Sequence, residues 1–153
     1  MSTIYLDNAA TTRVRDEVVK SMASVIKNEY GNPSSTHSYG RSSKSLIELS
    51  RKEISEVLNV KSSEIIFTSG GTEGDNMIIR NCVNNLGVTH IITTKIEHHA
   101  VTHTIDDLVC SNNIKVSFVK LSKLGDVDLE DLENILKTND QKSLVSLMHI
   151  NNE

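Results

Sequence analysis

The stretch IIFTSGGTEGDN, residues 65–76, places a glycine turn between an apolar run and a segment of helical character. Gly70 and Gly71 allow a tight turn with no side chain in the way, and Thr72 to Asp75 matches a Thr-x-x-Asp helix start. The free N–H groups and the dipole at such a helix start favour a phosphate, and Thr72 adds a hydroxyl donor. The turn is therefore a candidate phosphate site.

The spacing of the glycines excludes two familiar phosphate-binding motifs. No Gly-Lys-Ser/Thr follows the turn, so it is not a P-loop, and Gly70, Gly71 and Gly74 do not fit the dinucleotide G-x-G-x-x-G spacing. An ordinary glycine turn with a capping residue also explains the stretch. A phosphate site and a plain capped turn both remain open at this point.

Short apolar runs alternate with helical patterns along the rest of the chain. Apolar residues at helical spacing predict four helices, around residues 18–26, 46–58, 78–86 and 129–136. Four runs predict strands: EIIFT (64–68), HIITT (90–94), IKVSFV (114–119) and SLVSLM (143–148). Between the first two helices, YGNPSSTHSYG (30–40) is predicted to be a loop because glycine, serine and the only proline interrupt regular structure. Strands that alternate with helices indicate an α/β fold with a mostly parallel sheet.

Composition and charge narrow the classes of partner. A length of 153 residues predicts one domain, and a net charge of -4 with no basic block leaves no electrostatic footprint for nucleic acid. No apolar run approaches the roughly 20 residues that a membrane span needs. Cys82 and Cys110 form no disulfide or CxxC pattern, and the amino terminus lacks the pattern of a signal peptide. We expect a soluble, cytoplasmic protein that binds small molecules or proteins, with no nucleic acid and no membrane.

A second polar cluster, TTKIEHHAVTH (93–103), follows the strand HIITT and has three interpretations. His99 and His103 are four residues apart and can share a helix face that binds a metal, although the Glu of H-E-x-x-H is missing. An exposed, solvated pair is the second interpretation. In the third, one imidazole at the strand end lies flat against a planar ligand.

A third candidate is HINNE (149–153), in which Asn151 and Asn152 carry hydrogen-bond donors and acceptors after the last predicted strand. Asparagines in this position also make ordinary turns. The carboxyl ends of parallel strands meet at one edge of a sheet, where ligands bind. Strands that end near Gly71, His98 and Asn152 would therefore bring a phosphate site, a flat ring and an amide together.

Six motifs resemble those of cysteine desulfurases, members of the class V aminotransferase family: YLDNAATT, YGNPSSTHSYG, FTSGGTEGDN, EHHAV, GDVDLEDLE and LVSLMHINNE. They occur in the family's order, and the resemblance spans the whole chain. It implies the large domain of a fold-type I transferase that depends on pyridoxal 5′-phosphate, a three-layer sandwich with a mostly parallel sheet. It also implies a homodimer, and the GNPSS loop is similar to the branch that serves iron–sulfur cluster assembly.

The resemblance implies a role for each candidate residue. Gly71 and Thr72 are expected to bind the cofactor phosphate, His98 to stack on the pyridine ring and assist catalysis, and Asn152 to bond the phenolic oxygen of the ring. The implied reaction converts L-cysteine to L-alanine and passes the sulfur, as a persulfide, to acceptor or scaffold proteins for iron–sulfur cluster assembly or thiolation. No metal is implied.

The resemblance also implies a domain layout. Residues 1–14 are expected to pack with the small domain of the family, and residues 15–153 to form an incomplete large domain. The family's Schiff-base lysine, ring-nitrogen aspartate and persulfide cysteine are expected beyond residue 153, while Cys82, on an apolar helix stripe, is expected to be inert. The chain alone is therefore predicted to be inactive. A non-catalytic fragment that binds pyridoxal phosphate or another phosphate, a related class V aminotransferase and a selenocysteine lyase remain alternatives.

Overall fold

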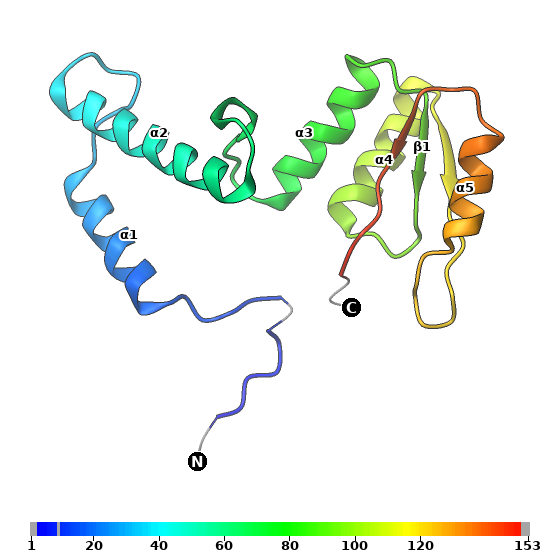
Figure 1. Cartoon of the computed structure of the whole chain (residues 1–153), viewed down its shortest axis with the longest axis horizontal. Helices are drawn as coiled ribbons and strands as arrows, with labels where there is room; N and C mark the ends of the chain where they lie inside the picture. Colours follow the sequence, from blue (N-terminus) through cyan, green and yellow to red (C-terminus); the bar gives the residue numbers. More distant parts are fainter. Residues whose placement is uncertain (1–2, 9, 151–153) are drawn as a thin grey trace. The chain divides into compact units, whose positions relative to one another are not determined.

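The computed structural model describes residues 3–8 and 10–150, except the side chain of Asn112. The chain divides into two compact units, Met1–Phe67 and Thr68–Glu153 (Figure 1). The first unit holds two α-helices and a 3₁₀-helix, and the second unit holds three α-helices and a three-stranded sheet.

The first unit contains α1 (Asp16–Asn28), α2 (Ser38–Leu58) and the 3₁₀-helix η1 (Ser62–Glu64). The apolar periodicity thus predicted both α-helices correctly. None of the residues of α1 is buried, and Met22 on its apolar stripe is 55% exposed. Because burial of an apolar face supplies most helix stability, α1 gains little from packing within this unit.

The loop prediction for residues 30–40 is correct only in part, because α2 already begins at Ser38. The ring nitrogen Nδ1 of His37 accepts the N–H of Gly40 at 3.2 Å and caps the helix. A Cβ atom on Gly31 would lie 2.4 Å from the carbonyl group of Tyr39, so only glycine allows this backbone approach. The loop is therefore a compact turn whose last residues are helical.

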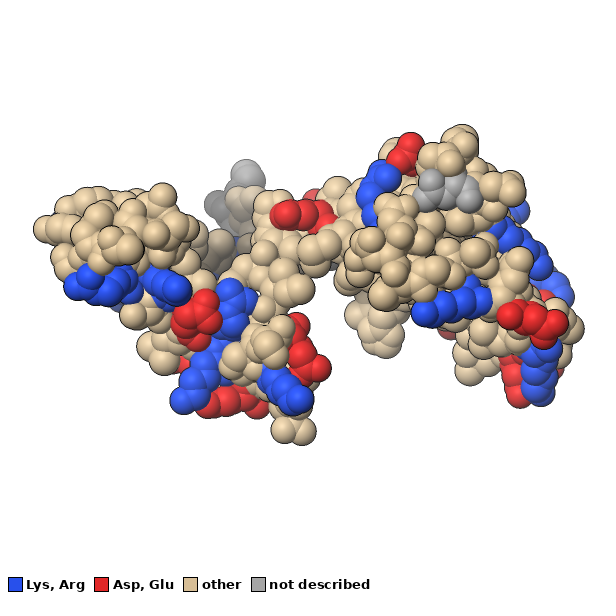
Figure 2. All heavy atoms as spheres, turned by 90° about the horizontal axis from the view of Figure 1, so that it is seen from above, with Lys and Arg blue, Asp and Glu red and all other residues tan. Residues whose placement is uncertain are grey.

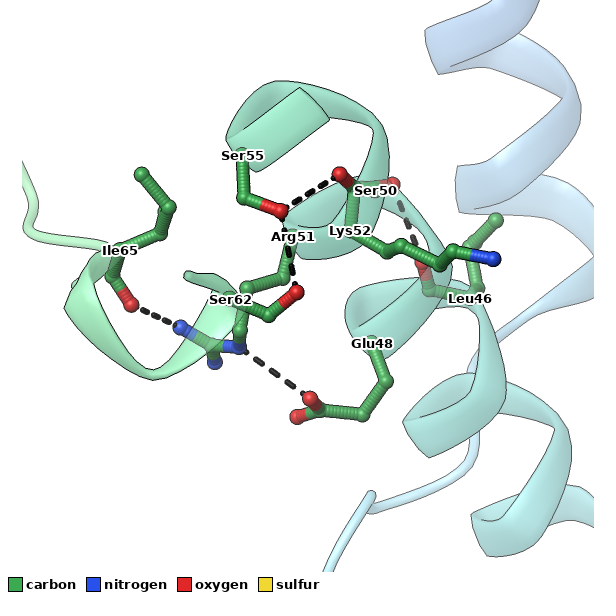
Figure 3. Close-up of polar contacts among 8 residues, drawn as sticks. All are labelled: Leu46, Glu48, Ser50, Arg51, Lys52, Ser55, Ser62 and Ile65. Atoms are coloured by element: carbon green, nitrogen blue, oxygen red, sulfur yellow. Dashed lines mark hydrogen bonds and ion pairs between the residues drawn. The ribbon is translucent and has the colours of Figure 1, made fainter. Parts of the chain in front are cut away.

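Polar contacts join α2 to η1 and to the residues that follow (Figure 3). The Ser55 and Ser62 hydroxyls lie 3.0 Å apart, and the Arg51 guanidinium donates to the Ile65 carbonyl. Ile65 has an extended backbone, but residues 65–68 pair with no other strand in the described part of the chain. The prediction of a strand at 64–68 is therefore wrong, because a strand requires a neighbour to complete its hydrogen bonds.

The second unit alternates helices and strands, as predicted. Its elements are α3 (Gly71–Asn84), β1 (His90–Thr93), α4 (His99–Asn112), β2 (Lys115–Phe118), α5 (Leu129–Lys137) and β3 (Ser143–Val145). The strand order is β2-β1-β3 and both pairings are parallel, with His90 beside Lys115 and Ser143. Three of the four predicted strands are confirmed, although the last ends at Val145 instead of Met148.

The core of the second unit lies between the sheet and helices α3 and α4. Its buried apolar residues are Ile79, Val88, Ile91, Val101, Ile105, Leu108 and Ile114, with Cys82 packed against them. All four residues of β1 are buried, as expected for a central parallel strand covered on both faces. Figure 1 shows the sheet between α4 on one side and α5 on the other, the three layers predicted.

Charged side chains of both signs are interspersed on the face drawn in Figure 2, in each of the two units. This pattern agrees with the small net charge of -4. Among the helices of the described residues, none is both long enough and apolar enough to cross a membrane.

Candidate functional site

The glycine turn leads directly into α3. Gly70 is the N-cap, with extended dihedral angles, and no side chain caps the helix. The predicted capping role of Thr72 is therefore wrong, because the helix starts at Gly71 and places Thr72 inside the first turn. Instead, the Ser69 N–H donates to Glu73 Oε2 at 2.6 Å, and the hydrogen bonds from Ser69 lower the pKa of the Glu73 carboxyl.

The space in front of this helix start is open. A Cβ atom built on Gly70 or on Gly71 would meet no atom within 4 Å. The first N–H groups of an α-helix have no acceptor within the helix, and here no side chain takes their place. The turn therefore offers amide donors that suit an anionic oxygen.

The start of α4 presents His98. Its Nδ1 accepts the N–H of Ala100 at 3.0 Å, so His98 is the N-cap of α4. A ring nitrogen that accepts a hydrogen bond carries no proton, so the proton of the neutral ring lies on Nε2. The side chain is otherwise exposed, and the helix cap fixes its position without using Nε2.

Thr72 and His98 line the same pocket, an open hollow of about 300 Å³ between α3 and the first turns of α4. The structure thus brings together two residues that are distant in the sequence and that were predicted to share a site. Gly71 directly precedes Thr72 in α3 but does not line the pocket. Asn152 lies outside the described residues.

The sequence patterns missed Asn76 and Arg80, which also line the pocket. Asn76 Nδ2 donates to the Thr72 carbonyl at 2.9 Å, and Arg80 Nε donates to Asn76 Oδ1 at 3.3 Å. Arg80 also forms a 2.7 Å ion pair with Asp107 of α4, which joins the two helices. Spacing of four residues from Thr72 to Asn76 to Arg80 on one helix face was the signal that would have found them.

His99 and His103 lie on one face of α4, as their spacing predicts, and both line this pocket. Their rings stack with centroids 5.0 Å apart, and both side chains are exposed. In the described part of the chain, no group of three or more His, Cys, Asp or Glu side chains is arranged to hold a metal ion.

The donor groups at this site differ in kind. The start of α3 supplies backbone amides and the Thr72 hydroxyl, while His98 supplies an imidazole ring whose Nε2 is not used by the helix cap. Amide and hydroxyl donors bind anionic oxygens, and a ring can stack on another flat ring. These residues therefore fit a ligand that combines a phosphate with an aromatic ring.

The sequence was next compared with models of known protein families. Residues 4–153 match the family described as Aminotransferase class-V. The chain belongs to this family. The resemblance noted from the motifs is thereby confirmed over nearly the whole chain.

Curated relatives and solved structures agree with this assignment. The chain is 42% identical to "Cysteine desulfurase IscS" of Dictyoglomus turgidum, over 98% of this chain and 38% of that protein. The structure "NIFS-LIKE PROTEIN" aligns with a TM-score of 0.89 and 40% identity over 98% of this chain and 41% of that one. "SspA in complex with cysteine" aligns with a TM-score of 0.86 and 28% identity over 99% of this chain and 43% of that one.

Two conclusions follow from these comparisons. The fold is that of fold-type I enzymes dependent on pyridoxal phosphate, as expected. The chain spans about two fifths of the length of the relatives it matches, and it corresponds to their amino-terminal part.

Proposed function

We propose that the complete protein is a cysteine desulfurase that uses pyridoxal 5′-phosphate. It converts L-cysteine to L-alanine and passes the sulfur, as a persulfide, to acceptor proteins for iron–sulfur cluster assembly or thiolation. The observation that carries the proposal is that Thr72 and His98 line one pocket at the starts of α3 and α4. Relatives named cysteine desulfurase, and a structural neighbour solved with cysteine, support the choice of substrate.

Each residue has a proposed task. The N–H groups of Gly71 and Thr72, with the Thr72 hydroxyl, hold the phosphate, and the His98 ring lies against the pyridine ring. His98 Nε2, which the helix cap leaves unused, exchanges a proton with the substrate. When bound, pyridoxal phosphate supplies an electron sink for negative charge at the substrate α-carbon. We assign Asn152 to the phenolic oxygen of the ring from the motif alone.

The proposal extends to the setting of the enzyme. We propose a cytoplasmic homodimer in which residues 1–14 pack with a small domain and residues 15–153 form part of the large domain. Its partners are L-cysteine and sulfur-acceptor or scaffold proteins. The structural neighbours, each matched over about two fifths of its length, support only the part of this proposal in which the chain forms a portion of a larger fold.

The test is sulfide release by the protein made from its complete gene, in the presence of a thiol reductant that cleaves the persulfide. We expect visible absorbance from bound pyridoxal phosphate and sulfide from L-cysteine, and a loss of at least tenfold in cofactor affinity for Thr72→Val. Thr72→Ser, which keeps the hydroxyl, is the matched control. Cofactor binding without sulfide release would favour the related aminotransferase, selenocysteine lyase or non-catalytic alternatives, which keto acids and selenocysteine as substrates distinguish.

A polypeptide limited to residues 1–153 is expected to release no sulfide in the same assay. Cys82 is packed against the core, and Cys110 lies twelve residues after His98 on α4, about 18 Å along the helix axis. Neither thiol is therefore placed to receive sulfur at the pocket. Lys95, three residues before His98, is the lysine nearest to this turn in the sequence. Sulfide release by this polypeptide that disappears in Lys95→Ala would contradict the expectation.

A further inference from the structure

Glu97 joins two segments at the carboxyl edge of the sheet. It lies in the turn between β1 and α4, and its Oε1 accepts hydrogen bonds from the Thr94 hydroxyl and the Met148 N–H, each at 2.8 Å. Thr94 is 1% exposed and directly follows β1, whereas Met148 follows β3. One carboxylate oxygen thus links the ends of two neighbouring parallel strands.

The Glu97 contact connects β1 and β3 beyond the point where their backbones are hydrogen-bonded to each other. A backbone bond between them runs from the Ser146 N–H to the Ile92 carbonyl at 2.9 Å. Two residues later, the Met148 N–H donates to the Glu97 side chain instead of to a backbone carbonyl. A carboxylate acceptor makes a stronger hydrogen bond than a neutral one, so this contact holds a stretch that has left the sheet.

The two linked segments carry the residues assigned to the cofactor. Glu97 directly precedes His98, whose ring is held at the start of α4, and Met148 precedes Asn152 by four residues. We propose that Glu97 is a positioning residue that holds the His98 turn against the segment leading to Asn152. This inference rests on the proposed function, because the cofactor roles of His98 and Asn152 belong to it.

Three substitutions of Glu97 test whether its acceptor oxygen is needed. Both bonds reach the same oxygen, so Glu97→Gln can keep them with its carbonyl oxygen, and Glu97→Ala removes both. Glu97→Asp keeps the charge, but its side chain is one methylene group shorter, so the carboxylate oxygen lies farther from both donors. The matched control is Glu133→Ala, which removes an exposed carboxylate of α5 that forms an ion pair with Lys137.

The experiment measures two quantities in the protein made from its complete gene. Hydrogen exchange followed by mass spectrometry reports the Met148 amide, and a titration of the cofactor-free protein reports affinity for pyridoxal phosphate. In Glu97→Ala and Glu97→Asp we expect faster exchange at Met148 and cofactor affinity lower by about tenfold or more. Glu97→Gln, which keeps an acceptor but not the charge, should give values between those of Glu97→Ala and wild type, and Glu133→Ala should change neither quantity.

The two readouts separate the two proposals. Unchanged exchange at Met148 in both Glu97→Ala and Glu97→Asp would show that the link is absent, whatever the cofactor does. Faster exchange with unchanged cofactor affinity would overturn the positioning role. Wild-type protein that shows a protected Met148 amide but no affinity for pyridoxal phosphate would instead refute the proposed function, and with it any role for Glu97 toward that cofactor.

Discussion

Gly71 occupies the first position of α3, where its N–H has no acceptor within the helix. Proline is well tolerated at this position, because its fixed φ angle suits the first turn and the missing N–H breaks no helical bond. The same position can therefore lose its amide donor while the helix keeps its structure. This separates a binding role of Gly71 from a structural one.

We expect Gly71→Pro to weaken pyridoxal phosphate binding by about tenfold or more, the effect of one hydrogen bond to a charged group. Gly71→Ala is the matched control, since it keeps the N–H and its Cβ atom meets no neighbour within 4 Å. Spectroscopic titration gives the affinity, and urea unfolding should show neither variant less stable than wild type. Equal affinity of the two variants would exclude this N–H as a phosphate donor.

Helix α4 depends on His98 for its start, and the proposed site depends on the same side chain. Nδ1 caps the helix by accepting the Ala100 N–H, while the ring faces the pocket that Thr72 also lines. Asparagine is a good N-cap but has no ring, and phenylalanine has a flat ring but cannot cap. The two substitutions therefore remove different functions of one residue.

For His98→Asn we expect stability near that of wild type, with cofactor affinity reduced about fivefold through the loss of an aromatic contact worth about 1 kcal/mol. For His98→Phe we expect a loss of about 1 kcal/mol in the free energy of unfolding and better retained affinity, but little activity because no ring nitrogen remains. Urea unfolding and cofactor titration measure the two effects. If one variant were both the more stable and the tighter binder of the cofactor, the capping and stacking roles of His98 would not be separate.

At the scale of the whole second unit, His90 connects all three strands. It is fully buried in β1, and its Nε2 lies 2.8 Å from the Ser117 hydroxyl of β2. Its Nδ1 lies 3.3 Å from the Ser143 hydroxyl of β3. Burial, and then the charge of Lys115, lower the pKa of His90 below its ordinary value of 6.5.

A lowered pKa means that the unfolded chain binds this proton more tightly than the folded protein does. The contribution of His90 to stability is therefore complete above pH 6.5 and is lost as the pH falls below 6.5 toward the pKa of the folded state. We expect the melting temperature to fall over this range, and His90→Gln to reduce that fall. His103→Gln, which changes an exposed histidine, should leave it unchanged. The prediction would be contradicted if the melting temperature of His90→Gln fell with pH as steeply as that of wild type.

Local patterns predicted much of this unit and part of the site. Apolar periodicity identified α3, α5 and three strands but not α4 (His99–Asn112), and the glycine turn and the His98 turn were both recognised as candidates. Two predictions were wrong because each used a short stretch of sequence to predict a feature that depends on its structural surroundings. Residues 64–68 were read as a strand and Thr72 as a helix cap, but a strand depends on a partner and a cap on where the helix begins.

The sequence by itself determined the α/β alternation and the family through its motifs, and it marked Thr72 and His98 as candidate site residues. Only the tertiary structure decided that these two side chains line one pocket, that Arg80 and Asp107 join the helices beside it, and that Glu97 reaches Met148. The physical reason is the separation of the contacting residues along the chain. Periodicity and turn chemistry are local properties of the chain, whereas contacts between residues 27 or 51 positions apart exist only once the sheet and its helices have packed.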